Sequence, residues 1–135
     1  RFNVFCHNCA AWDKKETLFF DGSGNRNSNI SDSLNTLSGK KAIEIEANTL
    51  DSILNGDSVD YIKYDVEGSE KEAIIGSQKT INKYHPDLLV SLYHRSEDVY
   101  SLPLQVKNLG YNRLYLRRFR YYPAWDLNLY AIKDQ

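Results

Sequence analysis

Apolar and polar residues alternate along the chain in a way that predicts strands separated by helices. Residues 42–47 alternate apolar and acidic side chains, the period of a strand with one face in water. Residues 61–66 form a further predicted strand, and residues 87–93 are nearly all apolar, as is typical of a parallel strand covered on both faces. Shorter strands are predicted at residues 4–9 and 17–20.

Helical signals lie between these predicted strands. A capping box over residues 69–72 predicts a helix that runs to about Tyr84, because the residue before Pro86 is pushed out of the helical region. Thr49 has the position of an N-cap before a short turn. Residues 21–41 are rich in Gly, Ser, Asn and Asp, which predicts a loop.

The last third of the chain adds one helix and two strands. The helix is predicted to begin at Ser96 or Ser101 and to end at Gly110. The strands are predicted at about residues 112–119 and 127–132, joined by an aromatic and basic loop.

The order strand, helix, strand, helix, strand, strand predicts an α/β fold with a mostly parallel sheet, helices on both faces and an antiparallel hairpin at the end. The length fits a single domain over residues 1–135. Within it, residues 1–56 would hold a strand with a loop and hairpin region, and residues 57–135 the strand-helix core.

Charge and hydropathy limit the classes of function that the chain can have. The chain has 17 Lys and Arg against 18 Asp and Glu, so it has no overall positive field that would hold nucleic acid or anionic lipid. No run of about 18 apolar residues could span a bilayer, and no secretion signal is visible. We therefore expect a soluble, cytoplasmic protein that acts on a small molecule.

Cys6 and Cys9 are the only cysteines, in a Cys-x-x-Cys spacing with His7 between them. Redox motifs of this kind usually open a helix, whereas residues 4–9 are predicted to be a strand, in which residues three apart point to opposite faces. A zinc site would need further ligands nearby. We therefore expect neither a redox nor a zinc role.

Candidate chemistry lies where predicted parallel strands end, because ligands bind outside the carboxyl ends of such strands. Asp65 and Glu67 follow one strand, and His94 and Arg95 follow the next. Two carboxylates and an imidazole at one edge suit proton removal or binding of a hard cation. A structural role was the alternative: Glu70 in particular would only offset the positive helix end.

A second candidate surface is the stretch from Arg113 to Arg120, which mixes guanidinium groups with aromatic rings. Such a mixture can hold phosphate, sugars or bases, which makes a binding module the alternative function. A strand at the edge of a sheet, whose charges prevent it from pairing with another chain, would show the same sequence pattern. If this strand runs parallel to the others, Arg118, Tyr121 and Trp125 could form a wall of the substrate site beside Arg95.

The run Asp60-Tyr61-Ile62-Lys63-Tyr64-Asp65-Val66-Glu67-Gly68-Ser69-Glu70 resembles the signature of the FkbM family of S-adenosylmethionine-dependent methyltransferases. Supporting segments are residues 10–16, the Thr49-Leu50-Asp51 step, residues 91–94 and residues 109–111. The resemblance covers nearly the whole chain.

This resemblance implies a Rossmann-like class I methyltransferase fold and transfer of a methyl group from S-adenosylmethionine to a hydroxyl of a saccharide or similar metabolite. Asp65 and Glu67 would face the methyl group and the substrate, with His94 as base or orienter. Asn8, Ala10 and Trp12 would neighbour the cofactor. A divalent metal is neither implied nor excluded.

The family's glycine-rich cofactor loop and ribose-binding acid have no counterpart before Asn3. Because the chain starts at Arg1 and has no Met, we expect the natural protein to begin upstream, and this C-terminal portion to be inactive alone. The strand at residues 4–9 would then lack its neighbours. We expect it to pair with a second copy, giving a homodimer, or to lie at an edge beside a rearranged neighbour.

Overall fold

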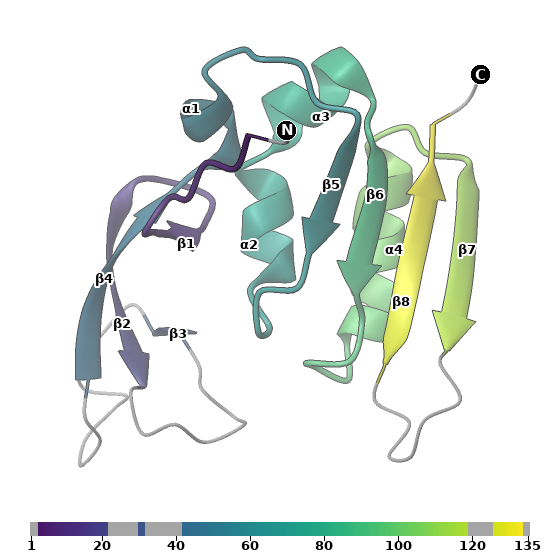
Figure 1. The fold of residues 1–135 in the computed structure, drawn as a ribbon. Coiled ribbons are helices and arrows are strands. Elements are labelled where there is room, and N and C mark those ends of the chain that lie inside the picture. The colour runs from purple at the N-terminus through teal and green to yellow at the C-terminus, as the bar shows by residue number, and fades with distance from the viewer. Residues whose placement is uncertain (1–2, 22–29, 32–41, 119–125, 134–135) are drawn as a thin grey trace.

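The computed structural model describes residues 3–21, 30–31, 42–118 and 126–133, which form two sheets and four helices (Figure 1). The first sheet has the order β1-β4-β2-β3 and the second β5-β6-β8-β7. The strands of the first sheet are β1 (Ala10–Ala11), β2 (Glu16–Asp21), β3 (Ile30–Ser31) and β4 (Ala42–Asn48). Those of the second are β5 (Tyr61–Tyr64), β6 (Asp87–Ser91), β7 (Arg113–Arg118) and β8 (Leu127–Ile132).

The second sheet is mixed: it ends in the antiparallel hairpin that was predicted, but only one of its three strand pairs is parallel. β5 and β6 pair in parallel, whereas β8 is antiparallel both to β6 and to β7. β8 enters between β6 and β7 because the final hairpin returns along the sheet. β7 therefore runs in the same direction as β5 and β6, as Figure 1 shows.

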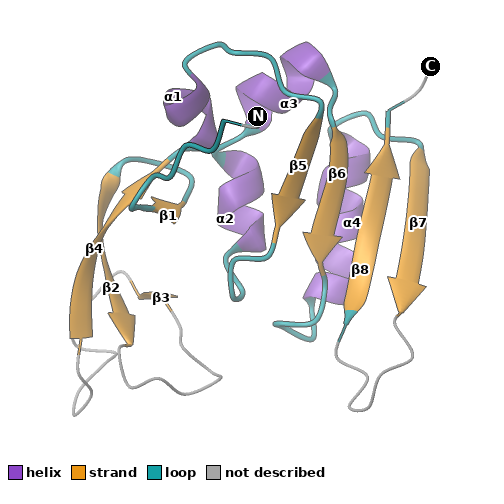
Figure 2. Cartoon of the chain, viewed as in Figure 1, coloured by secondary structure: helices purple, strands orange, loops and turns teal. Residues whose placement is uncertain are grey.

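The helices pack on one face of the second sheet, shown in Figure 2, rather than on both. They are α2 (Glu70–Ile75), α3 (Gln78–Tyr84) and α4 (Asp98–Asn108). Their apolar residues share a buried core with alternate residues of the strands, such as Ile62 and Leu88. Tyr61 and Tyr115, on the opposite face, are each 51% exposed. Within the described residues, the expectation of helices on both faces is therefore contradicted.

Residues 4–9 do not form the predicted strand. Only Ala10 and Ala11 pair, in parallel with Ala47 and Asn48 of β4, and Val4 and Phe5 are each 81% exposed. An isolated strand has no neighbour to accept its backbone hydrogen bonds, so its β-forming side chains alone do not hold it. β1 lies at the edge of the first sheet beside β4, but residues 4–9, for which an edge position was expected, form no strand. Pairing of this segment with a second copy stays a prediction.

The single helix predicted up to Tyr84 is two helices separated at Gly76 and Ser77. The predicted capping box does not form, because the Ser69 side chain makes no cap hydrogen bond. The end was predicted correctly: His85 adopts a left-handed conformation (φ 46°) directly before Pro86.

The other elements predicted within the described residues are confirmed to within a few residues. β2 and β4 occur where strands were predicted, α4 begins between the two expected starts, and β7 and β8 form the final hairpin. The predicted loop at residues 21–41 lies largely outside the described residues, apart from Asp21 at the end of β2 and β3.

Thr49 is the N-cap of α1 (Leu50–Leu54), as predicted, and its Oγ1 accepts a hydrogen bond from Ser52 N at 3.1 Å. We expect Thr49→Ala to lower the free energy of unfolding by about 1 kcal/mol, because one helix amide loses its acceptor. Thr49→Ser should keep most of this stability. Urea denaturation of both variants checks the prediction, and equal losses would contradict a capping role.

Candidate active site

The carboxyl ends of β5 and β6 bring together the three side chains that the sequence picked out. His94 Nε2 lies 3.8 Å from Asp65 Oδ1 and 3.6 Å from Glu67 Oε2. Asp65 directly follows β5, and His94 is three residues beyond β6. Since these two strands are parallel, their ends share one edge of the sheet.

Asp65 is held by hydrogen bonds from three different side chains. Its Oδ1 accepts from Ser91 Oγ at 2.9 Å and from Tyr93 Oη at 2.7 Å, and its Oδ2 accepts from Lys63 Nζ at 2.9 Å. Partial burial raises the pKa of Asp65, but these hydrogen bonds outweigh it and leave the pKa lowered. The side chain is therefore a well-oriented carboxylate near neutral pH.

The pKa of Tyr93 shifts in the opposite direction from that of Asp65. Burial, and then its hydrogen bond to Asp65, raise the pKa of the Tyr93 hydroxyl to about 12. Tyr93 therefore stays protonated and acts here as a hydrogen-bond donor to Asp65.

A left-handed turn follows β5 and directs Glu67 toward the imidazole. Glu67 has φ 55° and Gly68 has φ 92°. A positive φ is unfavourable for a residue with a Cβ, so Glu67 stores backbone strain at the site. At Gly68 a Cβ would also come within 3.2 Å of Arg95 Nε, so this position favours glycine on two grounds.

Glu70 is the functional candidate that the sequence interpretation missed. It is 1% exposed, its Oε1 accepts from Val66 N at 2.9 Å, and the same oxygen lies 2.8 Å from His94 Nδ1. Its position at the start of α2 suggested only a charge at a helix end. Its place in the same signature as Asp65 and Glu67 was the available signal.

Several polar atoms of this cluster are buried without a partner. Within the described residues, Glu70 Oε2 and both ring nitrogens of His94 make no hydrogen bond of acceptable geometry, although His94 Nδ1 is close to Glu70. Asp65, Glu70 and His94 each place one potential ligand atom within 4.8 Å of the others. These residues could therefore hold a metal ion.

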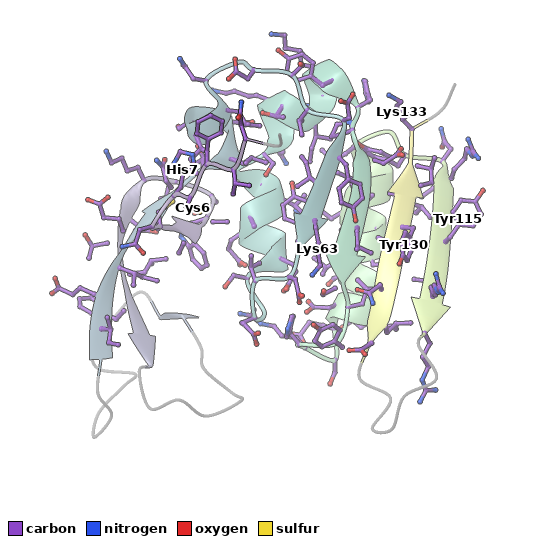
Figure 3. All side chains as sticks on the ribbon, in the orientation of Figure 1. Cys6, His7, Lys63, Tyr115, Tyr130 and Lys133 are labelled. Atoms are coloured by element: carbon purple, nitrogen blue, oxygen red, sulfur yellow. The ribbon has the colours of Figure 1, made fainter. Side chains whose placement is uncertain are left out.

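A groove of about 370 Å³ opens beside Asp65 on the uncovered face of the sheet. Figure 3 shows Lys63, Tyr130 and Tyr115 projecting from β5, β8 and β7 on this face. The residues that line the groove mix aromatic rings with polar groups: Lys63, Asp65, Leu89, Tyr93, Asp126, Asn128 and Tyr130.

The structure describes two of the four predicted substrate residues, Arg95 and Arg118. Arg95 is exposed and its side chain lies against Gly68, beside the cluster. Arg118 is exposed at the end of β7, which runs toward the same edge as β5 and β6. Tyr121 and Trp125 lie outside the described residues.

The predicted cofactor neighbours lie elsewhere, in the N-terminal part. Asn8 and Ala10 line a separate groove of about 530 Å³ beside β4, together with His7, Cys9, Glu44, Ile45 and Glu46. Trp12 is buried against Leu18 and Ala47 instead, and its Nε1 donates to Glu16 Oε1 at 2.7 Å. Trp12 therefore packs in a small core of the first sheet.

Cys6 and Cys9 are free thiols in the N-terminal segment, where Figure 3 labels Cys6 and His7. Among the residues that the structure describes, neither belongs to a metal-ligand cluster. A helix able to cross a membrane is likewise absent from the described part of the chain.

Comparisons with known proteins point to one family. Residues 5–120 match the Methyltransferase FkbM domain. The structure is similar to the crystal structure of methyltransferase FkbM from Methylobacillus flagellatus KT, with a TM-score of 0.65 and 25% sequence identity. The similarity covers 93% of this chain and 27% of that chain, so the chain spans about a quarter of that protein's length. No curated protein matches the chain.

Proposed function

Because the chain belongs to the FkbM methyltransferase family, we propose that it supplies the acceptor side of an S-adenosylmethionine-dependent O-methyltransferase. The observation that carries this proposal is the cluster of Asp65, Glu67 and His94 at the ends of β5 and β6. A hydroxyl placed among these groups would meet two carboxylate acceptors and an imidazole within hydrogen-bonding reach.

The reaction requires that a hydroxyl oxygen is aligned with the methyl group and that the hydroxyl loses its proton. The methyl donor supplies the methyl group, the oxygen–carbon bond forms as the sulfur–carbon bond breaks, and the hydroxyl proton leaves to the protein or to water. Holding the hydroxyl in one orientation makes the attack effectively intramolecular. In this chain Asp65, oriented by hydrogen bonds from Ser91 and Tyr93, is the acceptor that we assign to that purpose.

The role of Asn8, Ala10 and Trp12 as cofactor neighbours stays a prediction. Asn8 and Ala10 line a groove that shares no residue with the groove beside Asp65, and Trp12 is turned into a core. Dependence on S-adenosylmethionine is therefore proposed from family membership, and no step of the reaction is assigned to these three residues.

The groove beside Asp65 suits a polyhydroxylated acceptor such as a saccharide. Tyr130 and Tyr93 offer aromatic surface with hydroxyl tips, and Asn128 and Lys63 offer hydrogen-bonding groups. A pocket with aromatic walls and a few polar groups is the usual form of a small-molecule site. We propose that the substrate lies here, with one hydroxyl directed at Asp65.

Calorimetric titration with S-adenosylmethionine tests the function most directly. We expect the natural gene product that contains this chain to bind the compound at micromolar to millimolar concentrations, and to methylate members of a panel of methyl glycosides. We expect the 135-residue chain alone to show neither activity. If the natural gene product releases no heat above dilution and transfers no methyl group, the proposed function is wrong.

A further inference from the structure

We propose that Asp65, Glu70 and His94 bind a divalent cation, with Glu67 as a mobile fourth ligand. This inference deepens the proposed function and rests on it for the role of the ion. The binding itself can be measured without any methyl transfer.

Unpaired buried atoms are the first observation in its favour. Glu70 is 1% exposed, and its Oε2 has no hydrogen-bond partner in the described structure, although Oε1 is used by Val66 N. The His94 side chain is 10% exposed; its Nδ1 lies 2.8 Å from Glu70 Oε1, and its Nε2 has no hydrogen-bond partner in the described structure. Burying Glu70 Oε2 and His94 Nε2 without a partner is costly, which a bound cation would explain for both residues at once.

The spacing of the ligand atoms is the second observation. One atom each from Asp65, Glu70 and His94 lies within 4.8 Å of the others. Two ligands of one ion, each about 2.0–2.3 Å away, lie up to about 4.6 Å apart, so small side-chain movements close the site. Glu67 Oε2, on a side chain that is 61% exposed, is 3.6 Å from His94 Nε2 and can swing inward.

Charge and outer contacts agree with this assignment. Three carboxylates, at positions 65, 67 and 70, lie near two cationic side chains, Lys63 on Asp65 and Arg95 beside Gly68, which leaves the cluster negative. Hydrogen bonds from Ser91 and Tyr93 fix the Asp65 carboxylate, as the outer contacts of metal-ligating carboxylates commonly do. Carboxylates suit Mn²⁺ and Mg²⁺, and the imidazole shifts the preference toward Mn²⁺ or Zn²⁺.

A cation here would alter how the acceptor hydroxyl is activated. The ion would hold the hydroxyl oxygen and lower its pKa, so that the proton leaves to water. His94 would then serve as a ligand rather than as the proton acceptor. The proposed O-methyl transfer stands in either case, because only the agent that activates the hydroxyl differs.

Mn²⁺ alone is the probe for the test, with binding to the 135-residue chain followed by electron paramagnetic resonance of the free ion. We expect saturable binding to one site, weakened at least about tenfold in both Glu70→Gln and His94→Ala. Glu97→Gln, which changes an exposed carboxylate three residues beyond His94, is the matched control and should bind as the unchanged chain does.

Circular dichroism of each variant separates loss of the site from loss of the fold. Should Glu70→Gln unfold, Asp65→Asn, at a partly exposed position, provides the same comparison. The inference is overturned if Mn²⁺ does not bind, or if folded Glu70→Gln and His94→Ala bind it as tightly as Glu97→Gln does. Methyl transfer that persists in the presence of a chelator would overturn the ion's role in activating the hydroxyl, while leaving the proposed function intact.

Discussion

His94→Ala is expected to lower kcat/KM for methyl transfer by about 10²–10⁴-fold in the natural gene product that contains this chain. His94 Nε2 faces both Asp65 and Glu67, so the substitution removes the only imidazole of the cluster. The loss is expected whether the ring accepts a proton or ligates a cation. Transfer of a radiolabelled methyl group to the acceptor panel measures it.

The matched control for this prediction is His85→Asn. His85 lies at the end of α3, at the opposite end of the sheet, and asparagine tolerates its left-handed backbone. Activity should stay within about twofold of the unchanged protein, since the substitution alters no proposed catalytic group. If His94→Ala retains activity like that of His85→Asn, the cluster is not the catalytic site.

Gly76→Ala is expected to destabilise the fold by roughly 1–3 kcal/mol. Gly76, at the end of α2, lies directly against the backbone of the N-terminal segment. A Cβ at this position would overlap the backbone carbonyl oxygen of Trp12. Backbone cannot move aside as a flexible side chain can, so the contact between α2 and residues 12–13 must open. In urea denaturation, a lower midpoint concentration, with an unchanged dependence of the unfolding free energy on urea concentration, would show this loss of stability.

Gln78→Ala, two residues further along on the exposed surface, is the control for this substitution. Its free energy of unfolding should stay within about 0.5 kcal/mol of that of the unchanged chain. If Gly76→Ala is as stable as Gln78→Ala, the close packing of α2 against Trp12 does not contribute to stability.

The sequence predicted those parts of the structure that depend on local physics. Alternation in residues 42–47 indicated a strand, and β4 occurs there. The Thr49 hydroxyl indicated a helix start, because capping involves only neighbouring amides. The pair Asp65 and His94 could be brought together because consecutive strands joined by a helix run parallel, which places their ends at one edge.

Other features depended on partners far away in the chain and were missed. The position of Gly76 looks like ordinary helix until Trp12 packs against it. Glu70 looked like a charge at a helix end until burial placed it 2.8 Å from His94. Residues 4–9 have strand-forming side chains, but strand formation requires a neighbouring strand, and in the described N-terminal segment that precedes β2 only residues 10–11 have one.

The sequence by itself thus determined the order of the core elements, the Thr49 cap of α1 and the acidic and imidazole groups at the strand ends. Tertiary structure decided which face of the second sheet the helices cover, where the long helix breaks, and that Glu70 joins the site. The physical reason is the distance along the chain over which each interaction acts. Propensity and capping act over a few residues, whereas burial and close packing depend on segments that only folding brings together.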